Sequence, residues 1–151
     1  ERLISTDRPS SAGVAAPQAS AHYCVDRDDT IECVSPADIA WHAPGANSDG
    51  IGIEHAGYAR QSASDWSDPY SVAMLERSAC LVAQLCAAFD LPVEYVDRAG
   101  LLVGKRGITT HAAVSLAYRK STHTDPGPRF PMVWYIGRVL EHMAALLPPV
   151  A

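Results

Sequence analysis

Residues 70–89 read YSVAMLERSACLVAQLCAAF. Apolar side chains recur in this stretch at the spacing of one helix face, and polar residues such as Glu76 fall outside that face. The pattern predicts an amphipathic helix of about five turns, which is mainly a packing element. Residues 132–147 show the same periodicity and are followed by two prolines, which predicts a second amphipathic helix.

Short β patterns lie between and before these helices. Residues 20–35 alternate apolar and polar side chains on both sides of Asp28-Asp29, which predicts a β-hairpin with a two-residue loop. Residues 51–57, IGIEHAG, read as a largely buried strand, and residues 107–111, GITTH, as a short buried strand or its exit. Helices interleaved with strands predict an α/β fold with a single mixed β-sheet flanked by α-helices.

Composition excludes several classes of function. The chain has 151 residues, of which 48% are hydrophobic and 19% charged, and its formal net charge is -5. No run of Lys and Arg could neutralise a phosphate backbone, so we expect no nucleic-acid partner. No stretch of about 20 apolar residues occurs, so we expect no membrane span. The N-terminal sequence shows no signal peptide, and one globular domain is expected over residues 1–151.

The four cysteines form no CxxC pattern. With the hairpin loop placed as above, Cys24 lies opposite Cys33 in a non-hydrogen-bonded pair, within disulfide range. Two small unbonded residues in a half-buried hairpin explain this pair equally well. Cys80 and Cys86 lie six positions apart on the predicted helix, so we expect them to be free thiols in the core.

Acidic and imidazole side chains near the predicted strands form a candidate site. Glu54 interrupts an apolar strand, and a buried carboxylate there needs a cation, a metal or hydrogen-bond donors, whereas a strand-end carboxylate that reaches solvent does not. His111 at a strand exit and Asp125, held extended by Pro126, can converge on one point. His123 faces the same side of that extended segment as Asp125. Imidazole with carboxylate suits Zn²⁺, although by spacing alone a core histidine and a turn-forming aspartate are the more common explanation.

Five blocks of the sequence resemble the type 2 N-acetylmuramoyl-L-alanine amidases, the family that also contains peptidoglycan recognition proteins and many phage endolysins. They are, in chain order, SAHYCVDRD at 20–28, AWHA at 40–43, GIGIEHAG at 50–57, GITTH at 107–111 and HTDPGP at 123–128. The resemblance covers about residues 18–140 and is closest to bacterial and actinobacterial-phage members that carry HTDPGP. It implies the amidase fold and cleavage of the bond between the lactyl group of N-acetylmuramic acid and L-alanine in peptidoglycan.

The resemblance also implies a role for each candidate residue. It makes His111 the second and Asp125 the third protein ligand of a catalytic zinc ion. It makes Glu54 the general base that activates water, and it places His123 where the family has a Lys or His that stabilises the developing oxyanion. The groove for the stem peptide and the muramyl sugar would be lined by Trp41, His42 and Asn47.

The family's first zinc ligand, a histidine at the end of an opening strand, has no counterpart in this sequence, and residues 1–6 match the end of the first helix better. We therefore expect an amidase-like domain that lacks its N-terminal strand and holds zinc weakly through two ligands. His22 is the nearest replacement, although the family's histidine at that position serves structure. The alternative is a non-catalytic peptidoglycan-binding module with a degenerate metal site. Against it, both Glu54 and His123 are retained, and an unrelated α/β protein would require five coincident blocks.

Peptidoglycan is the expected partner, bound by a monomer in an antimicrobial or wall-remodelling hydrolase. The expected place of action is the cell wall, on its extracellular or periplasmic side, or the host wall in the case of a phage endolysin. An acidic domain without a basic patch has no electrostatic attraction to an anionic wall, so we expect targeting to reside elsewhere.

Overall fold

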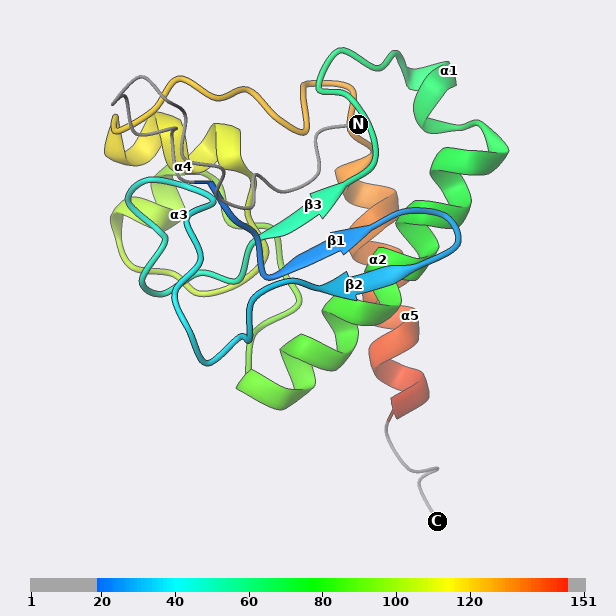
Figure 1. Cartoon of the computed structure of the whole chain (residues 1–151), viewed down its shortest axis with the longest axis horizontal. Coiled ribbons are helices and arrows are strands. Elements are labelled where there is room, and N and C mark those ends of the chain that lie inside the picture. The colour runs from blue at the N-terminus through cyan, green and yellow to red at the C-terminus, as the bar shows by residue number, and fades with distance from the viewer. Residues whose placement is uncertain (1–18, 147–151) are drawn as a thin grey trace, which may run out of the picture.

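Figure 1 shows a computed structural model of the chain, which describes residues 19–146. Within these residues, one sheet contains β1 (Tyr23–Val25), β2 (Thr30–Glu32) and β3 (Ile53–His55), in the order β2-β1-β3. β1 pairs antiparallel with β2 and parallel with β3, so the sheet is mixed. The helices are α1 (Ala63–Trp66), α2 (Pro69–Phe89), α3 (Arg98–Leu102), α4 (His111–Tyr118) and α5 (Met132–Leu146). The α/β class and the single mixed sheet predicted from the sequence are confirmed. The expectation for residues 1–6 lies outside the described residues.

Local capping chemistry sets the ends of α2. The carboxylate of Asp68 accepts a hydrogen bond from the Ser71 N–H at 2.7 Å, and Pro69 occupies the first turn, where its missing N–H costs nothing. The helix ends at Asp90, whose φ of 50° is left-handed and stops the helical path. The helix predicted over 70–89 is thus confirmed.

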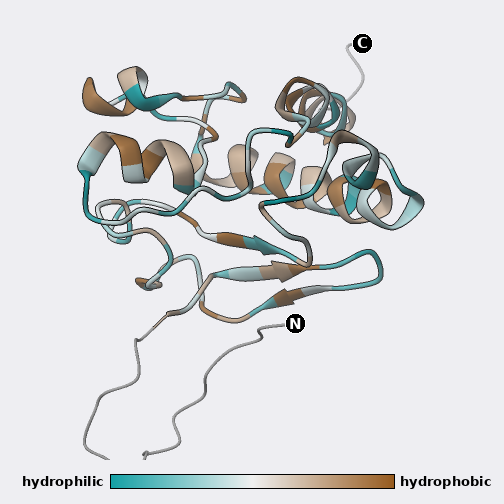
Figure 2. Cartoon of the chain, turned by 90° about the horizontal axis from the view of Figure 1, so that it is seen from above, coloured by the Kyte–Doolittle hydropathy of each residue, from teal (hydrophilic) through white to brown (hydrophobic). Residues whose placement is uncertain are grey.

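The hydrophobic core lies between α2, α5 and one face of the sheet. Met74 and Leu75 of α2 have no exposed surface, and they belong to a buried cluster with Val25 of β1 and Val139 of α5. Fully burying such a side chain stabilises the fold by about 1.5–3 kcal/mol. Figure 2 shows α2 and α5 together on one side of the sheet. The second predicted helix is confirmed as α5, and residue 147 lies outside the described residues.

α2 is also long and apolar enough, by length and composition, to cross a membrane. The expectation that no such stretch occurs is therefore wrong. Its buried side chains form the core shared with α5, and core helices meet the same criterion. The length and composition of α2 are thus weak support for a membrane span.

The hairpin turn begins one position earlier than predicted. Cys24 pairs with Ile31, so the two-residue loop consists of residues 27–28. Asp26 explains the difference, because its carboxylate accepts the backbone N–H groups two and three positions later, at 2.7 and 2.6 Å, and so nucleates the turn. The strands shift by two positions relative to the prediction. Cys24 and Cys33 therefore share a face of the sheet, and the prediction that they lie directly opposite each other is wrong.

Residues 107–111 do not form a strand. Ile108 makes a single parallel bridge with Tyr95, and the Thr110 hydroxyl accepts the N–H three residues later at 3.1 Å, which caps α4. The threonine that suggested a strand is used as a helix cap. His111 is consequently the first residue of α4 and not a strand exit, which corrects the prediction.

His55 of β3 is joined to the two long helices by a chain of polar contacts. His55 Nε2 lies 2.6 Å from Ser78 Oγ of α2, and that oxygen lies 2.6 Å from Tyr135 Oη of α5. The Phe130 ring stacks on the imidazole with centroids 6.0 Å apart. Burial lowers the pKa of His55 to about 4. The ring is therefore neutral at neutral pH and joins the strand to both long helices.

We expect His55 to make the protein less stable in mild acid. The unfolded chain takes up a proton on this histidine near pH 6.5, whereas the folded chain does so only near pH 4, so the contribution is complete above about pH 6.5 and is lost as the pH falls toward 4. The loss should reach at most about 3 kcal/mol. His55→Gln can still bond Ser78 but does not titrate, so urea unfolding from pH 7 to pH 4 should show a shallower decline for this variant. Parallel declines for the two proteins would contradict the assignment.

Candidate functional site

Three side chains place their donor atoms together between α4 and the loop that follows it. Donor atoms of His111, His123 and Asp125 all lie within 4.8 Å of one another. The distance from His111 Nδ1 to Asp125 Oδ2 is 3.2 Å, and that from His123 Nδ1 to Asp125 Oδ1 is 3.4 Å. The imidazole rings stack with centroids 4.0 Å apart. The predicted convergence of His111 and Asp125 is present, and His123 joins them as a third donor of a kind that zinc accepts. The HxD spacing is the sequence signal for this third donor.

Backbone contacts hold the loop against the start of α4. The N–H of Ala112, in the first turn, donates to the carbonyl oxygen of Asp125 at 3.0 Å. Gly127 then turns the chain with φ 90°, and its N–H donates to the Thr124 carbonyl at 2.9 Å. A Cβ at Gly127 would overlap the backbone of Ala59, so only glycine permits this approach. The position of Asp125 therefore depends on the backbone on both sides of it.

His111 is the more enclosed imidazole of the cluster. Its side chain is 14% exposed, against 58% for His123. Burial lowers the pKa of His111 below its usual value, an effect that Asp125 opposes, so the ring is neutral and able to ligate a metal. His111 Nε2 is buried and has no hydrogen-bond partner among residues 19–146. Because an unpartnered buried nitrogen is costly, the site fits a bound group that would satisfy it, such as a metal ion.

Glu54 lies on the solvent side of β3. Its side chain is exposed, and only residues 53–55 join the ladder, so of the two alternatives the strand-end carboxylate that reaches solvent fits the structure. The pKa of Glu54 is nevertheless raised, first by partial desolvation and then by the Asp125 carboxylate, while His123 acts in the opposite direction. These effects show that Glu54 is within electrostatic range of the cluster. A carboxylate with a raised pKa beside such a cluster can take a proton from water.

The three residues predicted to line a groove all lie on the loop before β3. Trp41 is 58% exposed. Asn47 Oδ1 accepts the N–H groups of His42 and Ala43 at 3.0 and 2.7 Å, and His42 Nε2 lies 3.0 Å from the Gly50 oxygen. Burial lowers the pKa of His42, and the neighbouring His22 and His111 act in the same direction. His42 and Asn47 therefore shape the loop, while Trp41 presents a free ring; their contact with substrate stays a prediction.

His22 has a structural role, because both of its ring nitrogens make hydrogen bonds within the fold. It is 1% exposed, its Nδ1 accepts the Gly52 N–H at 2.9 Å, and its Nε2 lies 3.1 Å from the Asp38 oxygen. Because Nδ1 is an acceptor, Nε2 carries the proton and donates to Asp38. Both ring nitrogens are thus occupied, which leaves neither for a metal. The structural role implied by the family resemblance fits this geometry, and His22 as a replacement ligand does not.

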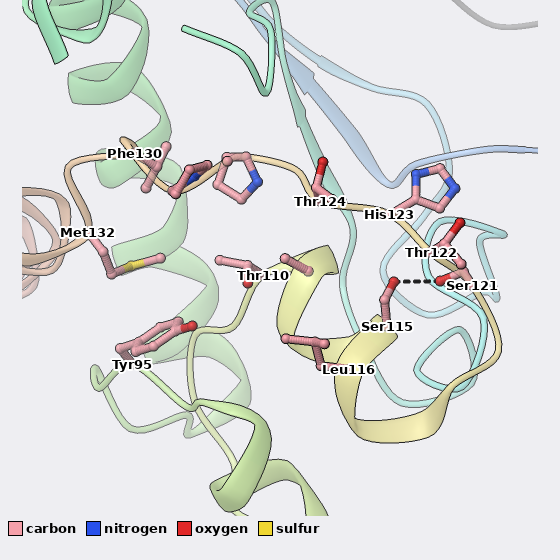
Figure 3. A pocket seen from close by; sticks show the side chains of 14 residues that line it. Tyr95, Thr110, Ser115, Leu116, Ser121, Thr122, His123, Thr124, Phe130 and Met132 are labelled. Atoms are coloured by element: carbon pink, nitrogen blue, oxygen red, sulfur yellow. Dashed lines mark hydrogen bonds between the residues drawn. The ribbon is translucent and has the colours of Figure 1, made fainter. Parts of the chain in front are cut away.

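An open groove of about 670 Å³ runs along α4 beside this cluster. Figure 3 shows His123 at one end of the groove and Phe130 and Met132 at the other, with Leu116 of α4 between them. Ser115 of α4 and Ser121 of the loop bond through their hydroxyl oxygens at 2.6 Å. The groove reaches the candidate site only at His123, because His111 and Asp125 do not line it.

Comparisons with known proteins find a matching family and a similar solved structure. A family model described as N-acetylmuramoyl-L-alanine amidase matches residues 2–128. Among solved structures, the chain resembles the Staphylococcus aureus hydrolase AmiA in complex with its ligand, with a TM-score of 0.65 and 19% sequence identity. The likeness covers 83% of this chain and 61% of the AmiA chain, and at this identity it supports the fold alone. No curated protein matches the sequence.

Gly52 is the point where packing of the site leaves no room for a side chain. A Cβ at Gly52 would overlap the His42 ring, so Gly52→Ala should lower the free energy of unfolding by about 1–3 kcal/mol. Gly137→Ala is the matched control, because a Cβ there meets no described atom within 4 Å and alanine should stabilise α5 by about 0.5–1 kcal/mol. Urea unfolding measures both variants. Two changes of the same sign and size would contradict the close packing at Gly52.

Proposed function

The chain belongs to the N-acetylmuramoyl-L-alanine amidase family, and from this premise we propose that it hydrolyses the amide bond between the lactyl group of N-acetylmuramic acid and L-alanine in peptidoglycan. The observation that carries the proposal is the convergence of His111, His123 and Asp125 within electrostatic range of Glu54. Amide hydrolysis needs an activated water, a stabilised oxyanion and a proton for the leaving amine. The four side chains offer a group for each need.

His111 and Asp125 are the proposed ligands of a zinc ion. The lowered pKa of His111 keeps its ring neutral, and its buried Nε2 lacks a partner among the described residues. Asp125 adds a carboxylate oxygen, and its backbone is fixed to α4 through Ala112. When bound, zinc polarises the amide carbonyl and makes water more acidic.

Glu54 is the proposed general base. Its raised pKa makes the carboxylate a better proton acceptor than an ordinary exposed glutamate. It takes the proton of the attacking water and passes it to the leaving amine of L-alanine, so the proton count balances. Its exposure supports this role, because the substrate and water must reach it from solvent.

His123 is the proposed oxyanion stabiliser. It is the more exposed of the two stacked imidazoles, and its Nδ1 faces Asp125 at 3.4 Å. An exposed imidazole N–H at this position can donate a hydrogen bond to a negative carbonyl oxygen. The same 4.8 Å convergence supports a second role for His123, as a third zinc ligand. The two roles predict different zinc contents for His123 variants.

A glycan strand is proposed to reach the site along the loop that carries Trp41 and His42. Trp41 presents a free ring near His42, and aromatic rings offer a flat apolar surface against which substrate can pack. All proposed site residues come from one chain, so a monomer suffices. The substrate places the proposed action at the cell wall, as in a wall-remodelling hydrolase or an antimicrobial phage endolysin.

Two substitutions separate the base from the metal ligands. Glu54→Gln should keep zinc and lower the hydrolysis rate by about 10² to 10⁴, since an amide cannot accept the proton. Asp125→Ala should lose zinc and activity together, because it removes a ligand. The measurements are zinc per chain by mass spectrometry after dialysis and release of L-alanine amino termini from purified peptidoglycan.

Glu94→Gln is the matched control for Glu54→Gln, because Glu94 is an exposed carboxylate on the loop after α2. It should leave both readouts unchanged. Retained hydrolysis in Glu54→Gln would remove the assigned base. Tight peptidoglycan binding by the wild-type chain, with zinc present and no release of amino termini, would replace the hydrolase proposal by a binding module.

His123 is tested by two replacements. As an oxyanion stabiliser, His123→Ala should keep zinc and lose about 10²- to 10³-fold in rate, and His123→Lys should recover part of that rate through its positive charge. His111→Ala is the comparison, because it should lose zinc. Loss of zinc from both His123 variants would instead make His123 a ligand.

A further inference from the structure

Two thiols meet on the sheet face opposite α2. The sulfur atoms of Cys24 and Cys33 lie 3.6 Å apart, and both thiols are free and partly exposed. Cys24 pairs with Ile31, whereas the Cys33 N–H donates to the His22 oxygen at 2.8 Å. Cys24 of β1 and Cys33, the residue after β2, are therefore diagonal neighbours with side chains on one face of the sheet.

We propose that Cys24 and Cys33 are a reversible modification site, converted to an intramolecular disulfide by a small disulfide such as oxidised glutathione. A disulfide needs the sulfur atoms about 2.05 Å apart, so forming the bond requires the two sulfur atoms to move closer than the 3.6 Å that separates them here. Their partial exposure admits a small oxidant from solvent.

The exchange balances without a further reactant. The thiolate of one cysteine attacks a sulfur of the small disulfide, which forms a mixed disulfide and expels one small thiolate. The second cysteine, as thiolate, then attacks the protein-bound sulfur and expels the second small thiolate. The two protons lost by the cysteines are taken up by the two leaving thiolates. The protein thiols are oxidised, and the small disulfide is reduced to two thiols.

The surroundings make the exchange selective and slow at neutral pH. Partial burial, together with the neighbouring Cys33 and Glu54, raises the pKa of Cys24 to about 11, so little thiolate forms unless the pH is alkaline. Cys86 is buried in the core, which protects it from the same oxidant. Cys80 is partly exposed on α2 and serves as an internal comparison.

The disulfide would link the central strand β1 to the residue that follows the edge strand β2. β1 lies between β2 and β3, and Cys24 is the ladder partner of Glu54. A bond to Cys33 closes a short loop of chain around the hairpin and limits the freedom of the unfolded state. We expect the oxidised protein to show a Tm about 5–10 °C above the reduced protein.

Tryptic digestion can detect the disulfide, because cleavage after Arg27 places the two cysteines on separate peptides. The wild-type chain is equilibrated with oxidised glutathione at pH 8.5, remaining thiols are alkylated, and the digest is analysed by mass spectrometry before and after reduction. We expect peptides 3–27 and 28–60 to be joined before reduction and separate after it. The Tm is measured on the same samples, with Cys24→Ser, Cys33→Ser and Cys80→Ser as matched variants.

Cys80→Ser should form the cross-link as the wild type does, whereas Cys24→Ser and Cys33→Ser should each hold a mixed disulfide with glutathione and show no rise in Tm. Alkylated Cys24 and Cys33 in the oxidised wild type would overturn the proposal. So would glutathione on both cysteines, or a dimer linked between chains on a non-reducing gel.

Discussion

The hydrogen bonds of His22 are the constraint on which the site end of the molecule depends. Its ring accepts from Gly52 and donates to Asp38, and its backbone N–H donates to the Gly52 oxygen at 3.0 Å. The first of these contacts joins β1 to the entry of β3, and the second holds the loop that carries Trp41. Because the ring is buried, an unmet nitrogen there would be costly. A histidine that resembles a metal ligand in the sequence is thus used entirely for architecture.

The candidate site is assembled from two parts of the chain that lie far apart in the sequence. The sheet presents Glu54 from β3, and α4 with the loop after it presents His111, His123 and Asp125. Each side is held by its own backbone contacts, the ladder of β1 with β3 and the bond from Ala112 to the Asp125 oxygen. The two sides lie close enough for the Asp125 carboxylate to raise the pKa of Glu54.

Adjacent residues of β3 face opposite surroundings, one toward solvent and the other toward the helices. Glu54 faces solvent, where a carboxylate can exchange protons, while His55 is neutral and tied through Ser78 to Tyr135. The same alternation in β1 puts Val25 in the core and Cys24 on the open face. A one-residue slip of either strand would exchange these environments, so the ladder register determines which side chains can react.

Sequence by itself determined the long helices and the α/β class, because amphipathic periodicity is a local signal that acts within a few residues. It also singled out Glu54, His111, His123 and Asp125 through motif spacing and family resemblance. Their convergence required contacts across the fold.

Only the tertiary structure decided the details that depend on partners distant in the chain or on competing local bonds. Asp26 moved the hairpin turn, and Thr110 turned an apparent strand into a helix start. The burial of Glu54 stayed open in the sequence because the width of the sheet and the elements covering each face are not encoded in the strand's own residues. The hydrogen-bond partners of His22 could likewise come only from the fold, because Gly52 and Asp38 lie up to 30 positions away. Periodicity reports which faces are apolar, and only packing determines what each face meets.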